Sequence, residues 1–101
     1  MTQSSSLERA GFATVTVEQF LNLTPDESAW IEMRLSLARE LRARREEADL
    51  TQTALAERIG SSQSRIAKAE RGTSGVSLDL LVRALLATGA TQNDIARALA
   101  T

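Results

Sequence analysis

The sequence contains no cysteine and no histidine, and each absence removes a class of chemistry. Without cysteine the chain can form no disulfide and no thiolate metal site, which fits a reducing cytoplasm. Without histidine it lacks the commonest general base and the usual zinc ligand. It also has no Gly-rich phosphate loop and no paired-carboxylate signature. An enzyme is therefore the poorest of the function classes, and we expect no catalytic residue, metal or cofactor.

Aromatic residues and long apolar runs are also scarce. The 101 residues include one Trp, two Phe and no Tyr, while Ala and Leu dominate. This length and composition predict one domain with a small, all-α core. No apolar run approaches the roughly 20 residues that a membrane span needs, and the N-terminus lacks the basic-then-apolar pattern of a signal peptide. We expect a cytoplasmic protein without a membrane partner.

The single proline, Pro25, marks the strongest helix start in the chain. Thr24 can cap the helix, Pro25 occupies its first position, and Glu27 completes a capping box. No Gly or Pro follows until Gly60. A long helix is therefore predicted to run from Pro25 to about Glu47.

Two segments of different character are expected before this helix. Residues 1–13 are polar and are interpreted as a disordered tail. Thr16 and Gln19 can form a capping box for a short helix over residues 17–21. We therefore assign residues 14–36 to an N-terminal helical extension.

The chain is organised around the stretch Leu50 to Gly72, in which two short helical segments lie on either side of Gly60. Thr51 can cap the first segment, and Ser62 the second. Gly60 supplies the left-handed conformation that ends a helix. This is the pattern of a helix-turn-helix. Its outer face is predicted to carry Gln63, Ser64, Arg65 and Lys68.

The stretch closely resembles the Cro/repressor family of bacterial and phage regulators, also called XRE. The resemblance covers roughly residues 37–99 and implies a bundle of about five short helices that binds double-stranded DNA; we assign residues 37–101 to this domain. The matching residues are Leu50-Thr51-Gln52, Leu55-Ala56, Gly60, Ser62-Gln63-Ser64, Ile66 and Glu70-Arg71-Gly72.

Two further helices are expected after Gly72. Ser77 can cap one over residues 78–87, which Gly89 ends, and Thr91 can cap another over residues 92–99. In the first of these helices Leu78, Leu81 and Leu85, with Val82 beside them, are expected to face the core. In the second, Ile95 and Leu99 lie four residues apart on one face.

The charge distribution is compatible with nucleic-acid binding although the net charge is −1. Residues 39–75 carry eight Arg or Lys against six acids, whereas residues 1–38 carry two against five. The basic excess lies on the helix-turn-helix but is small. We expect modest affinity for each monomer, raised by dimerisation.

Individual DNA contacts follow partly from chemistry and partly from the resemblance. A Gln amide can bond adenine N6 and N7 together, and an Arg can bond guanine O6 and N7 or a phosphate. The resemblance places Gln63 and Ser64 in the major groove and implies that Gln52 binds a phosphate and braces Gln63. Lys68 is expected on a phosphate; for Arg65 and Lys68 the alternative is a solvated surface. The remaining candidates for DNA contact are Ser62, Arg71 and Thr73.

The resemblance also implies a partly buried ion pair between Arg45 and Glu70, the alternative being two exposed charges. Two positions depart from the family pattern. Ala69 is smaller than the usual aliphatic residue, so Trp30 or the helix over 78–87 would have to fill the space. Ser61 replaces an apolar residue of the turn, which would leave the turn less anchored.

The leading interpretation is a sequence-specific regulator, a homodimeric repressor on a palindromic operator near the nucleoid. The N-terminal extension resembles that of HigA-type antitoxins, which implies a cognate toxin as a further partner. The half-helix from Trp30 to Leu37 either packs over the bundle or, like the last helix, forms a dimer surface. The alternative function is a protein-interaction module with this fold and little DNA binding.

Overall fold

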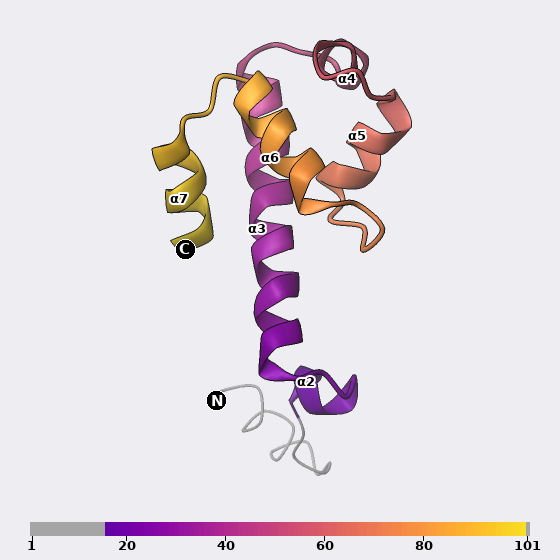
Figure 1. Ribbon diagram of the computed structural model, residues 1–101, viewed down its shortest axis with the longest axis vertical. Coiled ribbons are helices and arrows are strands. Elements are labelled where there is room, and N and C mark those ends of the chain that lie inside the picture. The colour runs from indigo at the N-terminus through magenta and orange to yellow at the C-terminus, as the bar shows by residue number, and fades with distance from the viewer. Residues whose placement is uncertain (1–15, 101) are drawn as a thin grey trace. The chain divides into compact units, whose positions relative to one another are not determined.

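The computed structural model describes residues 16–100, and every regular element within that range is a helix. The predicted tail, residues 1–13, lies outside the described residues. The all-α fold class is confirmed (Figure 1). The helices are α2 (Val17–Phe20), α3 (Pro25–Glu47), α4 (Gln52–Arg58), α5 (Gln63–Glu70), α6 (Leu78–Ala87) and α7 (Gln92–Ala100).

The chain divides into two compact units, Met1–Ile31 and Glu32–Thr101. In the first unit the two predicted capping boxes are present. The backbone N–H of Thr16 donates to Gln19 Oε1 at 3.0 Å, and that of Thr24 donates to Glu27 Oε1 at 2.8 Å. Each threonine Oγ1 accepts a backbone N–H in return, at 3.1 Å. Helix α2 ends at Phe20, one residue earlier than predicted.

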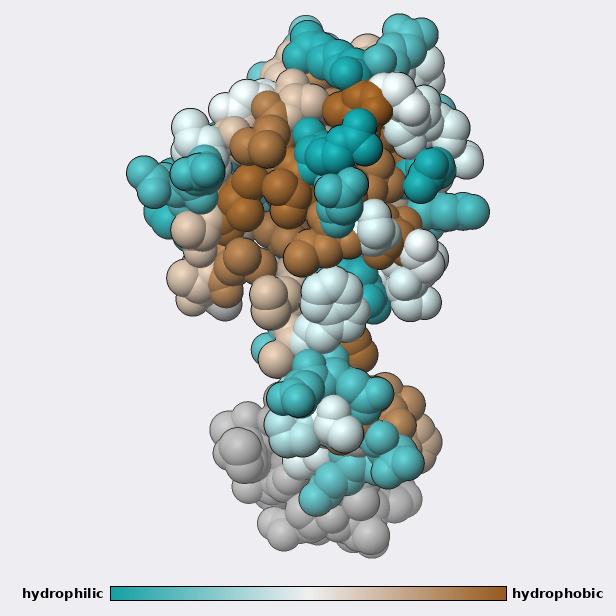
Figure 2. Space-filling view, in the orientation of Figure 1, coloured by the Kyte–Doolittle hydropathy of each residue, from teal (hydrophilic) through white to brown (hydrophobic). Residues whose placement is uncertain are grey.

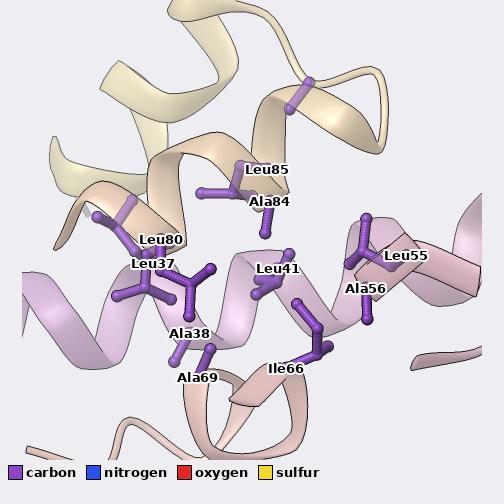
Figure 3. Close-up of a cluster of buried hydrophobic side chains, with 12 residues drawn as sticks. Leu37, Ala38, Leu41, Leu55, Ala56, Ile66, Ala69, Leu80, Ala84 and Leu85 are labelled. Carbon is purple, nitrogen blue, oxygen red and sulfur yellow. The ribbon is translucent and has the colours of Figure 1, made fainter. Parts of the chain in front are cut away.

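The second unit is a bundle built from the later part of α3 and the four helices that follow. Helix α4 packs against α5 and α6, and α5 and α7 each pack against α6. The side chains buried most completely in its core come from four of these helices (Figure 3). They are Leu37, Leu41, Leu55, Ile66, Leu81 and Leu85.

Helix α6 presents a wider face to the core than the one predicted. Leu81 and Leu85 are fully buried as expected, but Leu78 is only partly buried. Leu80 and Ala84 are buried instead, with 5% and 0% of their surface exposed. The buried face of α6 is therefore formed by residues 80, 81, 84 and 85, because neighbouring helices pack against α6 from more than one side.

Helix α7 makes polar contacts both at its own N-terminus and with α3. Thr91 and Asp94 cap its start reciprocally, because Thr91 N–H donates to Asp94 Oδ2 at 2.8 Å and Asp94 N–H donates to Thr91 Oγ1 at 3.1 Å. Hydrogen bonding of the Asp94 carboxylate to the backbone N–H and the side chain of Thr91, with the nearby guanidinium groups of Arg44 and Arg97, lowers the pKa of Asp94. Arg44 of α3 lies 3.2 Å from Asp94, so this ion pair ties α7 to α3.

Apolar side chains also reach the surface of the second unit. Figure 2 shows brown side chains gathered on the face that carries α6. Leu86 of that helix is 48% exposed, and Leu99 of α7 is 37% exposed. None of the described helices is both long and apolar enough to cross a membrane.

Candidate nucleic-acid interface

The helix-turn-helix is defined by caps at each junction. Thr51 caps α4 by accepting the Ala54 N–H at 3.0 Å. Gly60 ends that helix with a φ of +66°, the left-handed region in which glycine is favoured. Ser62 then caps α5 by accepting the Arg65 N–H at 3.3 Å. Because each cap fixes where a helix begins or ends, the turn between α4 and α5 has a defined path.

Helix α5 has one buried face and one face in water. Ile66 and Ala69 point into the core with none of their surface exposed. Among the described residues, none forms a hydrogen bond or ion pair with the side-chain nitrogens of Arg65, Lys68 or Arg71. Thr73 is partly buried just beyond the helix. The exposed residues of α5 and its caps are Ser62, Gln63, Ser64, Arg65, Lys68 and Arg71.

Arg45 and Glu70 form a two-point ion pair between α3 and the end of α5. Arg45 Nε lies 2.5 Å from Glu70 Oε2, and Arg45 Nη2 lies 3.0 Å from Glu70 Oε1. Arg45 Nη1 also donates to the Leu50 carbonyl at 2.8 Å. The side chains are only 12% and 5% exposed. The hydrogen bond to the Glu70 carboxylate raises the pKa of Arg45, so the guanidinium is charged at neutral pH.

Two glutamines extend this ion pair to the start of α5. Gln52 Nε2 donates to Glu70 Oε1 at 3.1 Å, and Gln63 Nε2 donates to Gln52 Oε1 at 2.6 Å. The family resemblance implied that Gln52 braces Gln63, and the structure brings the two side chains together. It also adds a bond that the sequence analysis missed, from Gln52 to Glu70. Gln63 is therefore exposed yet held at one edge of its amide.

The end of α5 has a second attachment to α3 that the sequence analysis missed. Arg34 is charged but only 8% exposed, and its Nε donates to the Gly72 carbonyl at 3.2 Å. The helical spacing could have indicated that Arg34 is buried, because it precedes Leu37 and Leu41 by three and seven residues and so lies on their buried face. Gly72 itself has a φ of +70°.

The small residue at position 69 lies in the bundle core. Ala69 and Ala38 are both buried and lie near each other in the core (Figure 3). A Cβ added to Gly72 would lie 3.8 Å from the Cβ of Ala38 and 2.5 Å from Leu35 Cδ2. Ala69 therefore shares one core cluster with Ala38 and with Leu80 of α6, while Trp30 is 40% exposed.

Ser61 anchors the turn through its backbone. Its N–H donates to the Ala56 carbonyl at 2.8 Å. Its hydroxyl Oγ is buried and has no hydrogen-bond partner among the described residues. The departure from an apolar residue at this position therefore leaves a buried polar group unpaired.

Comparison with known protein families identifies this arrangement. A family model described as a helix-turn-helix domain matches residues 36–98, well over half of the chain. The chain belongs to this helix-turn-helix domain family. The match supports DNA binding by this domain. The comparisons with curated proteins and with solved structures found no match.

Proposed function

We propose that this helix-turn-helix protein is a sequence-specific transcriptional regulator that represses by binding a palindromic operator as a homodimer. The observation that carries the proposal is the outer face of α5. Gln63 is held there by Gln52, and unpaired cations follow along the helix. A defined amide and a row of basic side chains are the two elements that base recognition and phosphate binding require.

Base recognition is assigned to Gln63 and Arg65. Gln63 uses one N–H on Gln52 and keeps one N–H and its Oε1 for a base. One donor beside one acceptor matches adenine N7 and N6. Arg65 is exposed two residues further along, and its guanidinium has the fork that matches guanine O6 and N7. Ser64 lies between them and can bond to any base.

General affinity is assigned to groups that meet the phosphate backbone. Lys68 lies one turn after Ser64 on the exposed face and offers a point charge. Gln52 opens α4, where free backbone N–H groups also favour an anion. The remaining backbone contacts are assigned to Ser62, Arg71 and Thr73.

Dimerisation follows from the size of the reading surface. One short recognition helix covers only a few base pairs, and two-fold symmetry places two such helices about 34–36 Å apart on one side of the DNA. Apolar side chains available for such an interface include Met33 and Leu35 on α3, each 37% exposed, and Leu99 on α7. We place the interface on one of these two helices.

The setting of this regulator is proposed from the sequence. We propose a cytoplasmic, nucleoid-associated protein without enzymatic activity. Its subtype is the antitoxin of a toxin–antitoxin pair that represses its own operon, because an N-terminal helical segment precedes the DNA-binding domain, as in HigA-type antitoxins. A co-encoded, short basic toxin that forms a complex with the chain would support this subtype, and its absence would favour a plain repressor.

A second candidate is a protein-interaction module that keeps the fold and has little DNA affinity. The exposed apolar residues of the first unit favour it, since Phe20 is 79% exposed and Leu21 is 55% exposed. Exposed apolar groups of this size are typical of a contact with another protein.

The test is selection of duplexes from a randomised pool, followed by binding of single-base variants of the selected operator at several salt concentrations. Gln63→Ala should relax preference at one position, at a cost of about 1–3 kcal/mol for the preferred base. Lys68→Ala should weaken all duplexes alike and lower the salt slope by about one. A selected pool that remains random, with no salt-dependent retention on DNA, would favour the interaction module.

A further inference from the structure

The hydrogen bonds that run from Glu70 to Gln63 have a fixed direction. Gln52 donates its Nε2 to Glu70, and Gln63 donates its Nε2 to the Oε1 of Gln52. An ionised carboxylate can only accept hydrogen bonds, whereas an amide can donate at one end and accept at the other. The carboxylate therefore decides which end of the Gln52 amide faces it, and this in turn decides which end of Gln63 faces Gln52.

The Glu70 carboxylate that accepts the Gln52 hydrogen bond is itself held in place. It accepts two hydrogen bonds from Arg45, at 2.5 and 3.0 Å, and is only 5% exposed. Each of its two oxygens therefore accepts a charge-assisted hydrogen bond from the guanidinium, and such bonds are stronger than those between neutral groups. Arg45 is itself fixed by the Leu50 carbonyl at 2.8 Å. Neither partner of the ion pair is free to turn.

We infer that Glu70 is a positioning residue that sets the base preference of Gln63 from the far end of α5. Through Gln52 it holds the Gln63 amide with its oxygen and one N–H turned away from the protein. That edge accepts from adenine N6 and donates to adenine N7. With the amide reversed, Gln63 would accept from Gln52 and present its NH2 group outward. A donor-only edge suits guanine, whose major-groove edge carries two acceptors.

This inference rests on the proposed function, since it assumes that Gln63 meets a base. The decisive variant is Glu70→Gln, which keeps the shape of the side chain but replaces one acceptor by a donor. An amide at position 70 can donate to Gln52, so both directions of the chain of bonds become possible. A bidentate contact discriminates about 5- to 150-fold between bases. We expect Glu70→Gln to reduce the preference for adenine over guanine at the Gln63 position by about threefold or more.

A matched control separates this effect from charge. Glu46→Gln on α3 changes the net charge by the same amount and also removes a carboxylate paired with an arginine, Arg42 at 3.3 Å. Both of those side chains are more than half exposed. Glu46→Gln should leave the ranking of operator variants unchanged.

The experiment measures binding of full-length variants to the selected operator and to its adenine-to-guanine derivative at the Gln63 position. Glu70→Gln is introduced into the wild type and into Gln63→Ala. We expect the adenine preference to fall in the first background and to stay unchanged in the second, where the amide that reads the base is absent. If Glu70→Gln lowers affinity for both duplexes equally, Glu70 is only structural and the inference is overturned.

Gln52→Ala gives the answer if Glu70→Gln does not fold. It cuts the chain of bonds in the middle and leaves the Arg45–Glu70 ion pair intact, so it should relax the same preference while lowering general affinity. An unchanged ranking with Gln52→Ala would overturn the inference. Failure of the proposed function looks different, because the wild-type protein would then bind both duplexes alike.

Discussion

Replacement of Glu70 by alanine is the perturbation that bears most directly on how the bundle is held together. Glu70→Ala removes three hydrogen bonds, two from Arg45 and one from Gln52. It leaves the Arg45 guanidinium, only 12% exposed, with the Leu50 carbonyl as its remaining partner. Removing one member of a buried ion pair costs about 3–5 kcal/mol, because the other charge stays buried. The Leu50 carbonyl and the residual exposure offset part of this cost, so we expect about 3 kcal/mol.

The assay is urea denaturation at neutral pH, followed by helical circular dichroism. Glu46→Ala is the matched control, because its ion pair with Arg42 lies on an exposed surface and should contribute at most about 0.5 kcal/mol. Replacing both Arg45 and Glu70 with apolar residues of similar volume should recover much of the loss, since no buried charge remains. If Glu70→Ala loses less than about 1 kcal/mol, or no more than Glu46→Ala, the pair does not behave as buried.

Three further variants test other contacts. Gly72→Ala should lower the free energy of unfolding by about 1–2 kcal/mol, as measured by urea denaturation. The loss should exceed that of Gly60→Ala. Both glycines have a positive φ, but only at position 72 would the added Cβ meet another side chain, Leu35 Cδ2 at 2.5 Å. Ser61→Ala should leave thermal stability unchanged or raise it by up to about 1 kcal/mol, because it removes a buried hydroxyl without a partner; a clear loss would contradict this. Because the pKa of Asp94 is lowered in the fold, its contribution to stability is complete above its usual value of 3.8 and is lost as the pH falls through its folded pKa. The difference in stability between wild type and Asp94→Asn should therefore be smaller at about pH 3 than at about pH 6. An equal difference at the two pH values would contradict a lowered pKa for Asp94.

The helix boundaries could be predicted because the interactions that set them are local. The boxes at Thr16 and Thr24 each join residues three positions apart. The same spacing applies where Thr51 and Ser62 cap α4 and α5. A contact between near neighbours depends little on the rest of the fold, so residue type and spacing are enough to identify it. Gly60 ends α4 for the same local reason.

The face that a helix buries depends on its neighbours and is harder to predict. In α6 an apolar residue occupies nearly every position, so spacing alone did not show that Leu80 and Ala84 are buried while Leu78 is only partly so. Long-range polar contacts raise the same difficulty. Arg34 could have met any of several acceptors, and only the fold brings the Gly72 carbonyl to it. The ion pair of Arg44 with Asp94 is another contact of this kind.

The resemblance to Cro/repressor proteins suggested two separate contacts, Arg45 with Glu70 and Gln52 with Gln63, and the structure joins them through one carboxylate oxygen. Glu70 Oε1 accepts from both Arg45 and Gln52. On the proposed assignment of Gln63 to a base, the same side chain then serves the packing of α5 on α3 and the orientation of the reading amide. A substitution at Glu70 should change stability and base preference together. Substitutions at Arg65 or Lys68, which lie in water without partners among the described residues, should change DNA binding at little cost in stability.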